Sequence, residues 1–282
     1  MMTLDLVDVF GSGALRGNPL AVVHGAEDLT ADQMLALTQW LGFSETTFLL
    51  PPTDPKADYR VRIFYPAGEL PFAGHPTLGS CFAWLAAGGV AANEGSIIQE
   101  CGAGLIEVQQ QGDQYAFAAP PMIKEGPLSD DERRYTASIA GVPEGSIAAA
   151  VHVQNGPQWQ LLQLASAKDV LACEPAAKAP PGTDIGVAGP CGSDDPADWE
   201  LRAFFANQHG QIIEDPVTGS FNAGVADYLF KSGQAKGAFV AAQGRKTGAD
   251  GRVHCRKDDD GSVWIGGRCD MIARGGALAA PD

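Results

Sequence analysis

The stretch ELPFAGHPTLGS, residues 69–80, places two prolines, a glycine and a histidine within six positions. It follows YRVRIFYP (59–66), whose residues alternate as in a β-strand. It runs into the largely apolar TLGSCFAWLAAGG (77–89), which is typical of a short helix. So many residues that break regular structure predict a turn, and this turn would deliver the N-terminus of the helix to a defined place.

A second copy of the stretch lies 145 residues downstream, as EDPVTGSFNAGV (214–225). Aligned without gaps, the copies correspond at five paired positions, which are Glu69/Glu214, Pro71/Pro216, Gly74/Gly219, His75/Ser220 and Gly79/Gly224. Each copy follows an aromatic-rich strand and precedes an apolar helix. An internal repeat in matching structural context predicts two domains of one design, related by a pseudo-twofold axis.

Each copy predicts a helix N-terminus that is open to a ligand. The first N–H groups of a helix have no partner within it, and the helix dipole makes that end positive. Gly74 and Gly219 would let a ligand approach the backbone closely, so two such ends facing each other across a cleft between the domains would hold an anion. The alternative is that the glycines only close tight strand-to-helix turns.

Short strands in series with few helices indicate the fold class. They favour a curled, mixed sheet around a helix over alternating βαβ units. We therefore expect an α+β protein with two pseudo-symmetric, barrel-like halves, residues 1–118 and 119–267, with residues 268–282 packing back on the first. The last eight residues, GGALAAPD, predict a frayed end. A separate helix is expected at TADQMLALTQWLG, capped by Thr30 and stopped by Gly42.

Composition limits the class of protein. The 282 residues are 45% hydrophobic and 19% charged, which is ordinary for a globular protein, and carry a net charge of -15. Without a basic patch, nucleic acid is not expected as a partner, and any anionic substrate must be attracted by local groups. Six scattered cysteines, no signal peptide and no apolar run of about 20 residues predict a cytoplasmic protein that neither contains disulfides nor spans a membrane.

Two kinds of site are not expected from the motifs. The glycine-rich GSGALRG, residues 11–17, follows a strand, but Asn18, Pro19 and another strand come after it where a dinucleotide-binding fold needs a helix. The five histidines lack metal-ligand spacing, so we expect no metal and no organic cofactor.

Three side chains are candidates for acid–base chemistry. Glu45 stands in a predicted buried strand, where desolvation would raise its pKa toward the range useful for proton transfer. Asp215 and His75 stand at the starts of the two repeated helix units. The alternatives are a solvent-facing edge position for Glu45, a helix-start residue for Asp215 and a capping-region histidine for His75.

With these residues assembled, the chain resembles the PhzF family of phenazine-biosynthesis isomerases. The resemblance is carried by VDVFGSGALRGNPLAVV, SETTFLLPP, YPAGELPFAGHPTLGS, EDPVTGSFNAGVADYL and AAQGRKTGADGRV. These segments span nearly the whole chain. The resemblance implies the diaminopimelate epimerase-like fold, an isomerase without a cofactor and a homodimer.

The resemblance also implies roles for individual residues. It makes Glu45 the general acid/base and places His75 and Asp215 beside the substrate as hydrogen-bonding or proton-transfer groups. It further implies five residues that contact the substrate or line its site, of which the first three would hold a carboxylate; they are Gly74, Gly219, Ser220, Ser44 and Asn18.

Two departures are informative. Epimerases and racemases of the wider superfamily carry a cysteine at the head of each repeated helix, whereas this chain has Ala73 and Pro216 where the thiols are expected. Cys81 is about two turns too deep to replace them. The family's G-R-P-G-R-like run near the C-terminus reads GADGRV here, which affects the expected substrate more than the chemistry.

These observations favour an isomerase that moves a proton within a small carboxylate-bearing, cyclic or amino-acid-like metabolite, in the cleft between the two halves. Glu45 alone would remove and return the proton. Two alternatives stay open: an epimerase or racemase that uses Glu45 with Asp215 or His75, and a non-catalytic protein that binds a small anion.

Overall fold

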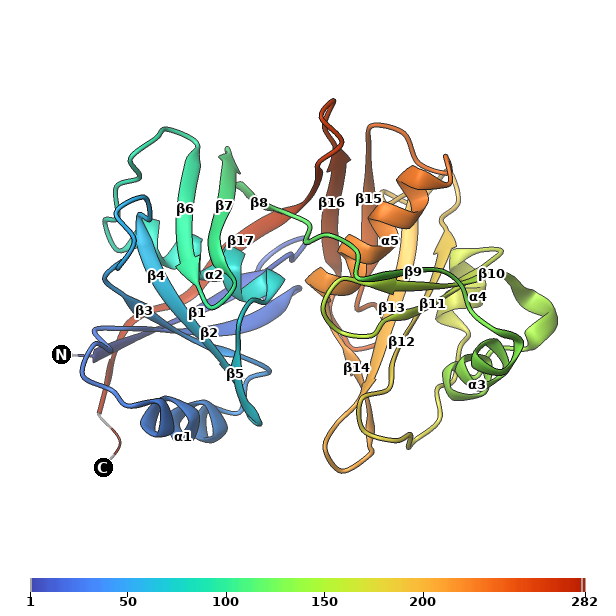
Figure 1. The fold of residues 1–282 in the computed structure, drawn as a ribbon, viewed down its shortest axis with the longest axis horizontal. Helices are drawn as coiled ribbons and strands as arrows, with labels where there is room; N and C mark the ends of the chain where they lie inside the picture. The colour runs from blue at the N-terminus through green and yellow to red at the C-terminus, as the bar shows by residue number, and fades with distance from the viewer. Residues whose placement is uncertain (1, 280, 282) are drawn as a thin grey trace. The chain divides into compact units, whose positions relative to one another are not determined.

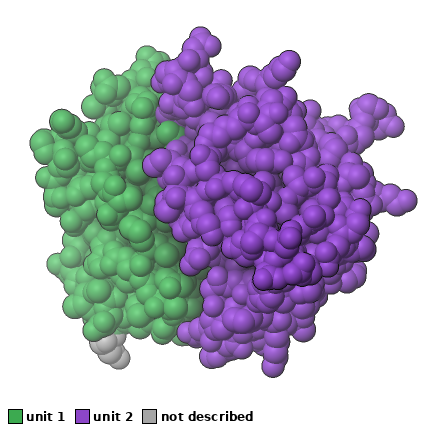
Figure 2. Space-filling view, turned by 45° about the vertical axis from the view of Figure 1, so that its right-hand side comes forward, with its two compact units in different colours: residues 1–118, 266–282 green, residues 119–265 purple. Residues whose placement is uncertain are grey.

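The computed structural model describes residues 2–279 and 281 and divides into two compact units. Unit 1 contains Met1–Ala118 and Gly266–Asp282, and unit 2 contains Ala119–Ile265 (Figure 2). The chain therefore returns to its first unit after completing the second.

In unit 1, strands close into a barrel. Its members are β1 (Met2–Val9), β2 (Asn18–His24), β3 (Thr46–Leu50), β4 (Tyr59–Tyr65), β6 (Ser96–Cys101), β7 (Gly104–Gln111), β8 (Gln114–Ala118) and β17 (Val263–Leu278). They pair in the order β17–β1–β2–β3–β4–β6–β7–β8, and β8 pairs again with β17. The β2–β3 and β4–β6 pairs are parallel and β1–β2, β3–β4, β6–β7 and β7–β8 are antiparallel, so the barrel is mixed.

Helix α2 (Gly74–Ala86) is the central helix of unit 1 (Figure 1). Its residues from Gly74 to Cys81 are all buried, and it contacts β1, β2, β3, β4, β6, β7 and β8. Gly79 lies so close to β2 that an added Cβ would come 2.5 Å from Leu20 Cδ2. A helix surrounded by sheet needs small residues on its contact faces, which explains the glycine late in the repeated motif.

Unit 2 repeats this design. Its strands are β9 (Lys124–Pro127), β10 (Ile147–Gln154), β11 (Gln160–Leu164), β12 (Asp184–Pro190), β13 (Trp199–Ala206), β14 (Ile212–Asp215), β15 (Ala238–Gln243) and β16 (Gly251–Lys257). The order β9–β10–β11–β12–β13–β15–β16 again has two parallel pairs, β11–β12 and β13–β15. Its buried helix is α5 (Gly219–Lys231), the counterpart of α2.

The strand registers place individual residues of the two units in correspondence. Strand β5 (Gly68–Leu70) pairs with β4 so that Glu69 lies opposite Phe64, and β14 pairs with β13 so that Glu214 lies opposite Phe204. One pairing further, Thr46 of β3 corresponds to Ile185 of β12. The fold class and the internal repeat expected from the sequence are confirmed.

The helices outside the two central ones begin differently. Helix α1 (Ala31–Leu41) has a capping box formed by Thr30 and Gln33 and ends at Gly42 in the left-handed conformation, as predicted. Helix α3 (Asp130–Ala140) has a second capping box, and the short α4 (Ala167–Leu171) is capped by a serine. A 3₁₀ turn spans Glu144–Ser146. None of the helices in the described residues has the length and apolar character to span a bilayer.

The expectation of a frayed C-terminal end, residues 275–282, is wrong for the first half of that segment, and residues 280 and 282 lie outside the described residues. Strand β17 continues to Leu278 and pairs with β1, with Met2 opposite Leu278. Asp5, which is buried, accepts the Gly275 N–H at 2.7 Å. The segment is rich in glycine and alanine, which have low strand propensity, so its order comes from pairing with the neighbouring strand β1.

Candidate functional site

Glu45 and His75 lie together in unit 1. Glu45 directly precedes β3, and His75 is the second residue of α2. Glu45 Oε2 and His75 Nε2 are 3.5 Å apart, and the two side chains are 19% and 7% exposed. A separation of 3.5 Å is long for a hydrogen bond, so the two side chains do not hold each other firmly. They are still near enough for both to contact one small ligand or to share a proton.

Burial sets the protonation state of His75. It lowers the pKa of this imidazole to about 3, because the charged ring would lose its hydration. The ring is therefore neutral at physiological pH and offers one N–H donor and one acceptor. A neutral imidazole next to a carboxylate can hydrogen-bond a substrate while Glu45 takes or gives the proton.

The N-terminus of α2 has no side-chain cap. Its N-cap residue, Ala73, makes no capping hydrogen bond, and the first turn contains no acidic residue. The same holds for α5, whose N-cap residue is Thr218. In contrast, α1 and α3 have capping boxes and acidic first turns. Two buried helices thus keep the positive ends that the outer helices neutralise, as an anion-binding role requires.

The residues expected to line the site in unit 1 differ in burial. Asn18 begins β2 and is buried, whereas Ser44 is exposed. The glycine-rich segment before Asn18 encloses the Asp8 carboxylate, which accepts N–H groups from Arg16 and Gly17 at 2.9 Å each. The GSGALRG segment therefore forms a loop around a buried aspartate. Position 17 needs a glycine, because a Cβ there would come 2.1 Å from Val9 O.

In unit 2, Asp215 and Ser220 lie on either side of the start of α5. Asp215 ends β14, and its Oδ2 accepts a hydrogen bond from Thr218 Oγ1 at 2.5 Å. Ser220 is the second residue of α5, the position that His75 occupies in α2. Trp159 Nε1 donates to Ser220 Oγ at 2.9 Å, so the serine hydroxyl can still donate its own hydrogen to an anion.

The paired glutamates of the repeat do not form part of an anion site. Glu69 accepts hydrogen bonds from Arg62 at 2.8 and 2.7 Å, and Glu214 accepts the same pair from Arg202 at 2.9 and 2.8 Å. Each guanidinium group also lies over the ring of a phenylalanine two residues later in the strand. Arg62 is 5.1 Å from the ring centroid of Phe64, and Arg202 is 4.9 Å from that of Phe204. These residues brace the hairpin that precedes each buried helix.

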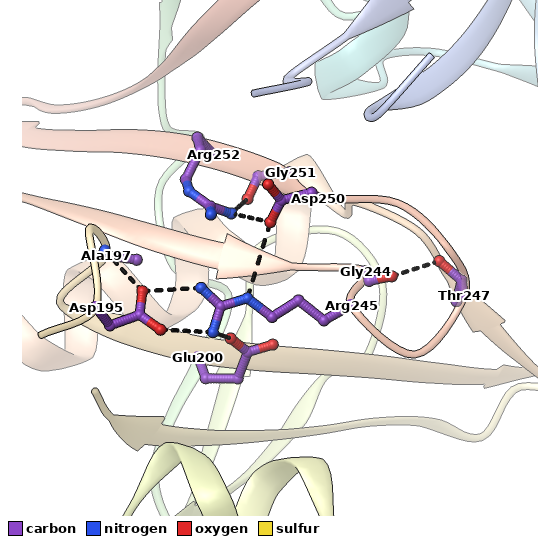
Figure 3. A network of polar contacts seen from close by, with 9 residues as sticks. All are labelled: Asp195, Ala197, Glu200, Gly244, Arg245, Thr247, Asp250, Gly251 and Arg252. Atoms are coloured by element: carbon purple, nitrogen blue, oxygen red, sulfur yellow. Dashed lines mark hydrogen bonds and ion pairs between the residues drawn. The ribbon is translucent and has the colours of Figure 1, made fainter. Parts of the chain in front are cut away.

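The GADGRV departure lies in a charged cluster of unit 2 (Figure 3). Arg245 makes two hydrogen bonds to Asp195, at 2.7 and 2.8 Å, and its Nη1 is 3.0 Å from Glu200 Oε2. Asp250 in turn accepts a hydrogen bond from Arg252 at 2.6 Å. Burial raises the pKa of Glu200 to about 7. The turn between β15 and β16 is therefore fixed from within unit 2.

The position of the second helix head needs a correction. The N-cap residues are Ala73 and Thr218, so Thr218, and not Pro216, corresponds to Ala73. Neither residue is a thiol. Cys81 is fully buried in the second turn of α2, and burial raises the pKa of its thiol to about 12, so it is protonated at physiological pH. Among the described residues no group of three or more metal-ligating side chains is arranged to hold a metal ion.

Several residues around Ser220 and Asp215 were not anticipated from sequence. They are Asn155, Trp159, Thr218 and Gln243. The internal repeat held a signal for the first two, because NGPQW (155–159) comes directly before β11 much as GNP (17–19) stands at the start of β2, the equivalent strand of unit 1. Nothing local marks Gln243, which acts on residues 25 and 28 positions away.

Comparison with known sequences gives matches along most of the chain. The protein named Antisense-enhancing sequence 1 from Schizosaccharomyces pombe is 33% identical over 95% of this chain and 96% of its own. Trans-2,3-dihydro-3-hydroxyanthranilate isomerase from Pseudomonas chlororaphis is 30% identical over 81% of this chain and 80% of its own.

Solved structures agree with this result. A phenazine biosynthesis protein of the PhzF family from Enterococcus faecalis superposes with a TM-score of 0.79 at 25% identity, covering 99% and 100% of the two chains. A hydroxyproline epimerase from Agrobacterium vitis, at 13% identity and a TM-score of 0.55, shares the fold over 96% and 91%. The sequence profile of the PhzC-PhzF family, described as phenazine biosynthesis-like protein, matches residues 7–275. This chain belongs to the PhzC-PhzF family.

Proposed function

We propose that this protein is an isomerase that moves a proton within a small carboxylate-bearing metabolite, with Glu45 as the general acid/base. The observation that carries the proposal is the Glu45–His75 pair, 3.5 Å apart, at the uncapped N-terminus of a buried helix. Relatives named as isomerases of a hydroxylated dihydro-aromatic amino acid support the reaction class.

The proposed chemistry needs only groups of this chain. The carboxylate of Glu45 takes a proton from a C–H bond of the substrate, and the electron pair delocalises toward the substrate's own carboxylate. Glu45 then returns the proton to a different carbon, so no electrons enter or leave. Helix N–H groups aimed at the developing negative charge stabilise it, an effect worth about 2.7–4 kcal/mol for one well-placed donor in other enzymes.

Gly74, Gly219 and Ser220 are proposed to bind the substrate carboxylate. Gly74 and Gly219 are the first residues of the two uncapped helices, and Ser220 has a hydroxyl hydrogen to donate. Because the two N-cap positions hold Ala73 and Thr218, the two-thiol chemistry of racemases has no counterpart here, which favours one-face proton transfer over epimerisation.

The test is solvent-proton exchange by NMR in D2O. Pooled small carboxylic and amino acids, with trans-2,3-dihydro-3-hydroxyanthranilate included, are incubated with wild type and with Glu45→Gln. We expect deuterium to enter one compound with wild type, and the rate to fall by about 10²–10⁴ with Glu45→Gln. Chiral chromatography of the product separates isomerisation from epimerisation.

A matched control comes from the repeat. The residue before Ile185 is Asp184, which corresponds to Glu45, and its carboxylate accepts the Gln158 N–H at 3.1 Å. Asp184→Asn should keep exchange within about threefold of wild type. Equal exchange with Glu45→Gln and wild type would refute the role of Glu45. A ligand that raises Tm without any exchange would favour a binding protein.

A further inference from the structure

Gln243, the last residue of β15, lies under the start of α5. It is fully buried. Its Oε1 accepts the Thr218 N–H at 3.1 Å and the Asn222 side-chain N–H at 2.7 Å. Its Nε2 donates to Asp215 O at 3.1 Å and to Thr218 Oγ1 at 2.9 Å. The amide of Gln243 thus uses both of its donors and both of its acceptor sites to bind three residues, Asp215, Thr218 and Asn222.

Thr218 passes this contact on to the carboxylate. Since its Oγ1 accepts from Gln243, its single hydroxyl hydrogen is directed to Asp215 Oδ2, at 2.5 Å. The threonine side chain is nearly buried, with the residue 8% exposed. A hydroxyl that donates its hydrogen to a carboxylate oxygen favours the ionised, accepting form of that carboxylate.

The backbone around this relay leaves little room for movement. An added Cβ at Gly244 would come 2.4 Å from Pro216 O, and one at Gly251 would come 2.4 Å from Val217 Cγ2. Charged groups on the neighbouring elements form ion pairs: Glu214 with Arg202, Arg245 with Asp195 and Glu200, and Asp250 with Arg252. Glycines at the contact points let the β15–β16 turn press on the segment before α5.

We infer that Thr218 and Gln243 are positioning residues that hold the Asp215 carboxylate as an ionised acceptor at the start of α5. The inference rests on the proposed function and on the family resemblance, which implies that Asp215 lies beside the substrate. Asp215 then receives or orients a polar group of the substrate, such as an amine or a hydroxyl, and Glu45 moves the proton.

Unit 1 supplies a matched control. Gln99 of β6 is also a fully buried amide that bonds its central helix, donating to Thr77 Oγ1 at 3.0 Å. Its Oε1 accepts from Tyr59 Oη at 2.8 Å. Thr77 corresponds to Asn222 in the repeat, so Gln99 supports α2 without reaching a candidate site residue. Replacing Gln99 removes two buried side-chain hydrogen bonds, against four for Gln243.

The experiment compares Thr218→Val, Thr218→Ser, Gln243→Met and Gln99→Met with wild type. Steady-state exchange is measured across pH, and the Asp215 carboxylate is titrated by ¹³C NMR, with its resonance assigned through Asp215→Asn. We expect Thr218→Val to lower kcat about tenfold with KM within threefold, and to move the acidic limb of the pH profile about one unit upward. Thr218→Ser restores both, and Gln99→Met lowers Tm alone.

Three outcomes would overturn the inference. One is that Thr218→Val and Gln243→Met change Tm but leave kcat and the pH profile as in wild type. A second is an equal loss of kcat with Gln99→Met. The third is an Asp215 titration that is the same in wild type and Thr218→Val. The last measurement needs no substrate, so it tests the relay even if wild type catalyses no exchange and the proposed function fails.

Discussion

Helices α2 and α5 occupy equivalent places in units 1 and 2 and differ in the side chains beside their N-termini. In unit 1 those side chains are Glu45 and His75, which can exchange a proton. In unit 2 the corresponding residues are Asp184, held by a backbone N–H, and Ser220, held by Trp159. Both units share the strand order, the uncapped central helix and the arginine–glutamate pair that fixes the hairpin before that helix, which we call the hairpin brace (Arg62–Glu69 and Arg202–Glu214).

The difference between the units distinguishes two features of the candidate site, the helix ends that can bind an anion and the side chains that can move a proton. Positive, uncapped helix ends occur in both units and so belong to the shared backbone. The carboxylate and imidazole of Glu45 and His75, in contrast, have Asp184 and Ser220 at the equivalent positions of unit 2. Three further pairs of equivalent residues test the difference between the units.

The largest effect on stability is expected at the hairpin brace. Arg202 and Glu214 are 5% and 15% exposed, and Arg202 also donates to Val170 O and Cys173 O. Arg202→Met leaves a partly buried carboxylate without its partner and removes the buried bonds to Val170 O and Cys173 O, which together cost about 3–5 kcal/mol. Arg62→Met, at the equivalent and more exposed pair, should cost about 1 kcal/mol or less. Urea unfolding of both variants measures the difference, and equal losses would contradict it.

A smaller contrast is expected at the second glycine of the motif. A Cβ at Gly224 would come 2.6 Å from Val153 O, which is backbone and cannot move aside. At Gly79 the nearest atom is the end of the Leu20 side chain, which can adjust. Gly224→Ala should destabilise by about 1–3 kcal/mol through overpacking.

Gly79→Ala provides the matched control. The gain in helix propensity from glycine to alanine, about 1 kcal/mol, should offset much of the strain at this position. Thermal unfolding of the two variants should therefore show a clearly lower Tm for Gly224→Ala alone. A lower Tm for Gly79→Ala would mean that the packing of α2 is as rigid as that of α5.

Much of this architecture could be predicted from the sequence, because its signals are local. Thr30 and Gly42 bound α1 as expected, and the gapless match of 69–80 with 214–225 revealed the repeat. The approach of Glu45 to His75 could not follow from spacing, since they are 30 positions apart and three strands lie between them. It could be anticipated only from the family resemblance.

Long-range contacts explain what the sequence did not reveal. Trp159 bonds a residue 61 positions away, and the order of the C-terminal segment depends on β1. The motif glutamates were equally ambiguous, because a carboxylate before a helix can cap it, repel an anion or pair with an arginine on the previous strand. Only the register of the hairpin identifies Arg62 and Arg202 as their partners.

The smallest expected effect is a pH dependence that belongs to unit 2 alone. Glu200 corresponds to Arg60 through the hairpin register and is fully buried beside Arg245, with Asp195, Asp250 and Arg252 nearby. Burial raises the pKa of Glu200 from 4.5 to about 7. The folded protein therefore binds this proton up to about pH 7, whereas the unfolded chain releases it near pH 4.5.

The sign of the effect follows from this difference in proton binding. The contribution of Glu200 to stability is complete below about pH 4.5 and is lost as the pH rises through about 7. We expect the free energy of unfolding of wild type to fall, relative to Glu200→Gln, by roughly 1–2 kcal/mol between pH 5 and pH 7, since one pKa unit corresponds to about 1.4 kcal/mol. Arg60→Gln should add no such slope, because an arginine stays charged throughout this range. Parallel pH–stability curves for wild type and Glu200→Gln would show that Arg245 keeps Glu200 ionised in the folded protein, and the cluster would then act as a permanent ion pair.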